Sequence, residues 1–81
     1  MPDQTAEVVK VTDAQASMLW SHASVYPSPV AHTPELGSVR TWHALYDKGL
    51  LARGTLTAAG IALVVRRYGT RHFPEALKNA A

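Results

Sequence analysis

The stretch SVRTWHALYDKGLLARGTLT, residues 38–57, carries the pattern that decides the fold. Four of its apolar residues recur at the spacing of one helix face: Val39, Trp42, Leu45 and Tyr46. This spacing predicts a helix whose apolar side faces the core. Lys48 followed by Gly49 predicts the end of that helix, because a cation and then a glycine favour a helix C-terminus. The segments on either side of Arg53-Gly54 are so short that only a tiny hairpin fits there. We therefore expect one helix followed by a two-stranded hairpin.

A helix is also predicted before this stretch. Thr12 and Gln15 have the spacing of a capping box, which marks a helix start. The following residues, 13–24, carry an apolar stripe at helical spacing, and Met18 widens it: Ala16, Leu19, Trp20 and Ala23. We expect Trp20 to pack against Trp42 and so to join the two helices.

A third helix is predicted over residues 57–68, with Thr57 as its cap and Gly69 at its end. One face of it is apolar: Ile61, Val64, Val65 and Tyr68. Leu63 and Ala59 lie off that face, so the helix is apolar on two sides. This double face suggests a homodimer, formed through the side chains of Leu63, Tyr68, Phe73 and Leu77. A short final helix is expected at about residues 74–79.

Between the first two helices lies a proline-rich connector over residues 25–34, which holds three of the five prolines. Thr33 and Pro34 then predict a new helix start. That start leads either into a single turn broken at Gly37 or into one helix that continues unbroken to Lys48. We favour the break, because an interior glycine costs about 1 kcal/mol relative to alanine and Ser38 is a good cap.

The composition bounds the class of protein. With 81 residues there is room for one small domain, which we expect over residues 11–69, after a flexible or extended lead-in (1–10) and before a short helical tail (70–81). No apolar run reaches the length of a membrane-spanning helix, and residues 1–10 do not resemble a secretory signal. The chain has no cysteine, which excludes disulfides and zinc ribbons. A cytoplasmic location is expected.

The charges are distributed unevenly. Residues 1–37 carry one lysine against four acidic residues, whereas residues 38–81 carry seven lysines and arginines against two acidic residues. A basic C-terminal half is suited to a polyanion if its cations share a face. A DNA-binding protein should therefore gather these side chains on one surface: Arg40, Lys48, Arg53, Arg66 and Arg67.

Three segments, taken in order, resemble winged helix-turn-helix regulators of the MarR-like type. VTDAQASML (11–19) resembles their opening LT-x-x-Q-x-x-x-L. Residues 38–53 resemble their recognition helix and the GL-[LV] after it, and LTAAGIALV (56–64) is similar to their LT-x-x-G. Residues 35–53 also resemble excisionase and MerR-type domains. The resemblance implies a mainly α, winged helix-turn-helix fold: a three-helix core, a very short two-strand wing and a short C-terminal helix.

The resemblance also implies a partner and a site. Helix 38–48 would enter the major groove of double-stranded DNA. The residues that would contact the DNA lie on this helix and on the hairpin: Ser38, Arg40, Thr41, His43, Ala44, Lys48 and Arg53. Arg40 would contact guanine, and Ser38 or Thr41 would hold phosphate oxygens. The implied function is that of a small transcriptional regulator.

An alternative class remains open. The second helix is at most one turn, the wing is nearly absent, and the long dimerisation helices of the family are missing. In this alternative, the chain is a winged-helix module that binds a protein and not DNA, for example a phage-encoded protein that docks on a host partner. No enzyme activity, cofactor or metal is expected, since the spacings of the four histidines match no ligand motif and no nucleophile motif occurs.

Overall fold

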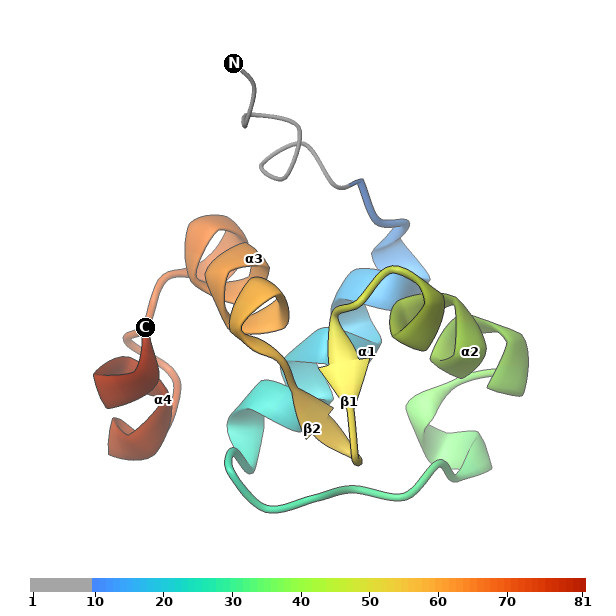
Figure 1. The fold of residues 1–81 in the computed structure, drawn as a ribbon, viewed down its shortest axis with the longest axis horizontal. Coiled ribbons are helices and arrows are strands. Elements are labelled where there is room, and N and C mark those ends of the chain that lie inside the picture. The colour runs from blue at the N-terminus through green and yellow to red at the C-terminus, as the bar shows by residue number, and fades with distance from the viewer. Residues whose placement is uncertain (1–9) are drawn as a thin grey trace.

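The computed structural model describes residues 10–81. This part of the chain is mainly helical, with four α-helices and one antiparallel hairpin. The elements follow in this order: α1 (Asp13–Ser24), a 3-10 turn η2 (Pro34–Leu36), α2 (Val39–Asp47), β1 (Leu51–Ala52), β2 (Thr55–Leu56), α3 (Ala58–Tyr68) and α4 (Glu75–Ala80). Figure 1 shows the hairpin in front of α1, with α2 and α3 on its two sides and α4 beyond α3. The predicted lead-in falls outside the described residues except for Lys10.

The predicted helix starts are confirmed at three positions. At α1, the Gln15 backbone N–H donates to Thr12 Oγ1 at 3.1 Å, and the Thr12 N–H donates to Gln15 Oε1 at 3.0 Å, which completes the capping box. Ser38 caps α2 and Thr57 caps α3 through equivalent side-chain bonds. At the fourth predicted start, η2 begins at Pro34 directly after Thr33 as expected, but the Thr33 side chain makes no capping hydrogen bond.

The predicted break between η2 and α2 is confirmed. Gly37 has a φ of 133°, a conformation that side chains rarely adopt, and the helical path stops there. α2 then ends as predicted: the Leu50 N–H donates to the Leu45 carbonyl at 2.9 Å and the Gly49 N–H donates to the Tyr46 carbonyl at 3.0 Å. Leu50 folds back into the core.

The hairpin is as short as expected. Leu51 pairs with Leu56 and Ala52 with Thr55, and Arg53 and Gly54 form the turn with φ values of 55° and 82°. Two positive φ values match the turn type whose twist suits a two-residue hairpin. Alternation then places Leu51 and Leu56 inward, where both are buried.

One core joins all four helices to the hairpin. Its buried members come from all four α-helices, from both strands and from the segments next to them: Met18, Leu19, Ala23, Leu45, Leu50, Leu51, Leu56, Ile61, Val64, Phe73 and Leu77. The residues after α3 therefore belong to the same core as the rest of the chain. Phe73 and Leu77 close it from the side of α4.

Two packing predictions are wrong. Val39 is 53% exposed, because it shares the outer side of α2 with His43, one turn later, while Leu45 marks the inner side. The two tryptophans do not pack on each other: Trp20 packs on Tyr68 and Phe73, with ring centroids 4.8 Å apart in both pairs. Trp42 instead packs on other aromatic rings, described below.

Candidate nucleic-acid interface

The first turn of α2 presents two hydroxyl groups. Ser38 Oγ accepts a hydrogen bond from the Thr41 N–H at 3.1 Å, and the two hydroxyl oxygens lie 2.9 Å apart. One hydroxyl proton serves the bond between them, so the pair retains a second proton for an acceptor outside the chain. Ser38 is exposed and Thr41 is half-buried. This pair is suited to donating to an oxygen such as that of a phosphate.

The outer side of α2 carries polar and charged side chains. Arg40, His43 and Asp47 are exposed, and the smaller Ala44 beside them is half-buried. Within residues 10–81, no hydrogen bond, ion pair or ring contact involves the side chain of Arg40 or His43. The guanidinium of Arg40 therefore keeps its five donors available for a ligand. Asp47 lies on the same side of α2 near its C-terminal end, where its negative charge would repel an anionic ligand.

The inner side of α2 is fixed by aromatic packing. Leu45 is fully buried. The Trp42 ring lies between three other rings, at centroid distances of 5.3 Å from His22, 5.5 Å from His32 and 5.3 Å from Tyr46. These contacts join α2 to α1 and to the proline-rich connector, so the helix presents its outer side in a defined orientation.

The tip of the hairpin is also held in place. The Gly54 N–H donates to the Tyr46 hydroxyl at 2.8 Å, and the Gly54 carbonyl accepts from the Val30 N–H at 2.8 Å. A Cβ at Gly54 would lie 3.1 Å from the Pro29 side chain, so glycine is needed for the close approach as well as for the turn. Arg53, next to it, is exposed.

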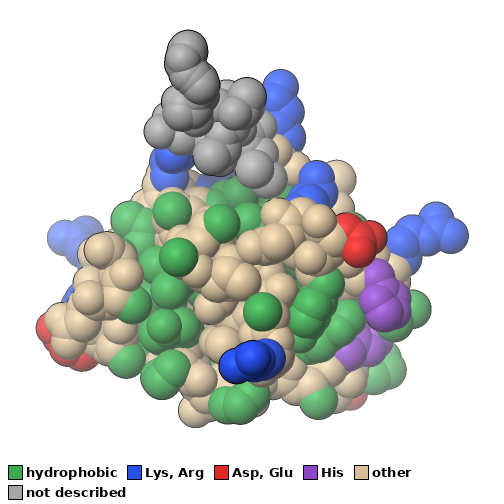
Figure 2. Space-filling view, viewed as in Figure 1, with side chains coloured by type: hydrophobic (Ala, Val, Ile, Leu, Met, Phe, Trp, Pro, Cys, Tyr) green, Lys and Arg blue, Asp and Glu red, His purple; other side chains and the backbone are tan. Residues whose placement is uncertain are grey.

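The structure does not bring the predicted basic residues onto one face. Lys48 Nζ donates to the Lys10 carbonyl at 2.9 Å, and Arg67 pairs with Asp13 at 3.2 Å, so both lie where α1 begins. Arg53 lies at the hairpin tip, at the opposite end of the view in Figure 1. Figure 2 shows the Lys and Arg side chains dispersed over the top, both sides and the lower middle of this face, with uncharged side chains between them.

The predicted dimer residues divide into two groups. Phe73 is 5% exposed and Leu77 is fully buried, so both belong to the core of a single chain and their predicted place at a dimer interface is wrong. Both are needed to cover Trp20 and α3, which the sequence pattern does not reveal. Leu63 and Tyr68 are half-buried and pack against the same core, so for these two the dimer stays a prediction.

The sequence analysis did not predict that one of the histidines is buried. His22 is fully buried, and its Nδ1–H donates to the Met18 carbonyl at 2.8 Å. Its Nε2 atom has no hydrogen-bond partner among the described residues. The signal was present, because His22 follows Leu19 and Met18 at helical spacing on the apolar side. No group of three His, Asp or Glu side chains gathers as a metal site anywhere in residues 10–81.

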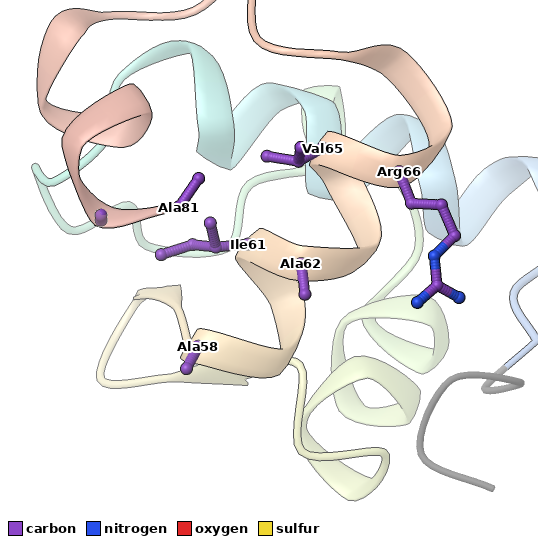
Figure 3. Close-up of a pocket in the computed structure, with 7 residues that line it drawn as sticks. Ala58, Ile61, Ala62, Val65, Arg66 and Ala81 are labelled. Carbon is purple, nitrogen blue, oxygen red and sulfur yellow. The ribbon is translucent and has the colours of Figure 1, made fainter. Parts of the chain in front are cut away.

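A shallow groove runs between α3 and the end of α4. Its volume is about 440 Å³, and its lining is apolar apart from one arginine: Ala58, Ile61, Ala62, Val65, Arg66, Ala80 and Ala81. In Figure 3, Ile61 and Val65 point toward the α4 end, while the Arg66 side chain extends away from it. The sequence analysis did not anticipate this groove.

Comparisons with protein-family models, with curated proteins and with solved structures found no match for this chain. The resemblance to winged helix-turn-helix regulators therefore rests on the residues quoted above and on the order of the helices and the hairpin. Among the described helices, none combines the length and the apolar character needed to cross a membrane.

Proposed function

We propose that this protein binds double-stranded DNA through the outer side of α2 and acts as a small transcriptional regulator in the cytoplasm. The observation that carries the proposal is the two-sided character of α2. Trp42 and Leu45 hold one side against the core, while Arg40 and His43 stand on the other without a partner among the described residues. A helix anchored in this way fits the width of the major groove.

The roles of the individual side chains follow from their chemistry. Arg40, in the first turn, has the planar donor pair that matches the two acceptors of guanine. The hydroxyl pair of Ser38 and Thr41 would donate to a phosphate oxygen and so fix the orientation of the helix. The small side chain of Ala44 allows close approach. Arg53, at the hairpin tip, would contact the DNA backbone.

One observation favours the alternative, a module that binds a protein. Asp47 lies on the outer side of α2, and Lys48 and Arg67 lie at a different end of the molecule from Arg53. A protein partner can use scattered charges and an exposed apolar residue such as Val39, whereas DNA favours one continuous basic surface.

The deciding experiment is fluorescence anisotropy of labelled duplex DNA, titrated at 50 mM and at 200 mM salt. We expect binding that weakens with salt, since phosphate contacts release counterions. On a duplex enriched from a random pool, Arg40→Ala should lose about 1–3 kcal/mol of binding free energy. Arg71→Ala is the matched control, because Arg71 is also an exposed arginine but lies beyond α3.

Both variants should keep the unfolding temperature of the wild type, because neither side chain contributes to the core. Absence of DNA binding at low salt would contradict the proposed function and favour the protein-binding module. A pull-down with the intact chain would then be used to find its protein partner. An equal loss of affinity in the two variants would show that Arg40 contributes only its charge.

A further inference from the structure

The hairpin turn contains an arginine in a backbone conformation that arginine rarely adopts. Arg53 has a φ of 55° and Gly54 a φ of 82°, so both central residues of the turn are left-handed. Glycine, asparagine and aspartate favour this conformation, and they dominate turns of this type. The Arg53 side chain is exposed, and it has no hydrogen bond, ion pair or ring contact with any other described residue. No contact within the described chain compensates for the strain at Arg53, which points to a role in binding.

Two hydrogen bonds hold the turn in this conformation. The Gly54 N–H donates to the Tyr46 hydroxyl at 2.8 Å, and the Gly54 carbonyl accepts from the Val30 N–H at 2.8 Å. In Figure 1, the turn lies beside the proline-rich connector that contains Val30. The Gly54 N–H belongs to the peptide group that joins Arg53 to Gly54, and this group is planar. The bond to Tyr46 therefore fixes the orientation of the peptide group that follows the Arg53 Cα.

The Tyr46 side chain is itself held in place. It lies in the last turn of α2, its ring is half-buried against the core, and the ring centroid lies 5.3 Å from that of Trp42. Among the described residues, Tyr46 is the only side chain of α2 that makes a hydrogen bond to the hairpin. Removal of the hydroxyl alone would therefore release the turn from this bond to α2 and keep the ring in the core.

We propose that Tyr46 is a positioning residue of the DNA interface. Its hydroxyl orients the turn and so holds the Arg53 guanidinium in place relative to Arg40 on the outer side of α2. This inference rests on the proposed function, in which Arg53 contacts the DNA backbone. A group that is ordered before binding loses less entropy when the complex forms. The Tyr46 hydroxyl therefore raises the affinity for DNA without contacting the DNA.

The test is the substitution Tyr46→Phe in the anisotropy titration on the enriched duplex. At 50 mM salt, it should weaken binding about twofold to fivefold, the scale of one exposed ionic contact, and by no more than Arg53→Ala does. Tyr68→Phe is the matched control. Tyr68 is also half-buried and packs on a tryptophan, Trp20, but its hydroxyl makes no hydrogen bond within residues 10–81. We expect the control to bind like the wild type.

The salt dependence separates positioning from a general loss of stability. If Lys48 and Arg53 each neutralise one phosphate, the affinity of a monomer falls about twelvefold between 50 mM and 200 mM salt. Loss of the Arg53 contact reduces this fall to about threefold to fourfold. Tyr46→Phe should lie between these two values. A variant that is only less stable would bind more weakly at both salt concentrations and keep the twelvefold ratio.

A double-mutant cycle identifies the residue through which Tyr46 acts. In the Arg53→Ala background, Tyr46→Phe should cause no further loss of affinity. In the Arg40→Ala background, it should cause the same loss as in the wild type, because Arg40 lies in the first turn of α2, away from the hairpin bond. Equal losses in both backgrounds would mean that Tyr46 acts only on the stability of the fold, and the inference would be wrong.

Hydrogen exchange measured by NMR tests the bond without DNA. The Gly54 amide should exchange faster in Tyr46→Phe than in the wild type and at an unchanged rate in Tyr68→Phe. Equal exchange rates in the wild type and Tyr46→Phe would overturn the inference, as would equal affinities for DNA. In both cases the proposed function stands as long as the wild type binds the duplex. If the wild type does not bind at 50 mM salt, the proposed function is wrong, and the role of Tyr46 in DNA binding is wrong with it.

Discussion

The substitution Gly60→Ala tests how closely α3 approaches the chain between α2 and β1. Alanine is normally the better helix residue by about 1 kcal/mol, and Gly60 lies inside α3 with an ordinary helical φ. At this position, however, an added Cβ would overlap the carbonyl oxygen of Leu50 and lie 3.2 Å from both the Leu50 carbonyl carbon and Leu56 Cδ2. The Leu50 carbonyl also accepts the Thr57 N–H at 3.1 Å.

The overlap is with backbone, which has no rotamer to change, so α3 must move away from Leu50. Overpacking of this kind costs about 1–3 kcal/mol, and loss of the Thr57 N–H bond adds about 1 kcal/mol. Against a propensity gain of about 1 kcal/mol, we expect a net loss of about 1–3 kcal/mol. For a domain of this size, this lowers the unfolding temperature by roughly 5–20 °C.

Thermal and urea unfolding followed by circular dichroism measure this loss. Ala59→Gly is the matched control: Ala59 is exposed on the same helix, so the reverse change should cost only the propensity term of about 1 kcal/mol. An unchanged or raised stability of Gly60→Ala would refute the reasoning, because α3 would then not lie against Leu50.

Two other substitutions test the packing around α1 and α2. His22→Leu should change the free energy of unfolding by no more than about 1 kcal/mol, because it removes the unpartnered Nε2 atom together with one hydrogen bond; a loss above 2 kcal/mol in urea denaturation would mean that a water molecule satisfies Nε2. Trp42→Ala should cost about 2–4 kcal/mol, because it removes contacts with His22, His32 and Tyr46, whereas Trp42→Phe should retain most of the stability. Equal unfolding temperatures for Trp42→Ala and the wild type would contradict the inference that Trp42 anchors α2 to the core.

The local signals in the sequence were sufficient for the secondary structure. Capping by Thr12, Ser38 and Thr57 depends on residues three positions apart, and the turn at Arg53-Gly54 depends on two neighbours. These interactions are settled by short stretches of chain. The predicted element order was therefore confirmed within the described residues.

The long-range packing was less accessible. Periodicity gives the apolar face of a helix but not the element that covers it, so the partner of Trp20 was missed. The sequence pattern led us to place Phe73 and Leu77 on a dimer surface. Their burial could not be predicted, because α4 is short and its docking depends on contacts with residues distant in the sequence. The distribution of the cations likewise depends on where the ends of three helices meet.

The salt dependence of DNA binding follows from that distribution of cations. In the proposed complex, three cations of one chain approach phosphates or base edges: Arg40, Lys48 and Arg53. Arg40 contacts a base in this proposal, so Lys48 and Arg53 neutralise two phosphates. With a slope close to −0.9 per neutralised phosphate, a monomer should show a slope of about −1.8 in a plot of log affinity against log salt. A homodimer should show about twice that value. Light scattering of the complex fixes the stoichiometry independently. A slope of about −3.6 or steeper for a proven monomer would mean that Arg66 and Arg67 also contact phosphate. The interface proposed on the outer side of α2 would then have to be extended to the last turn of α3.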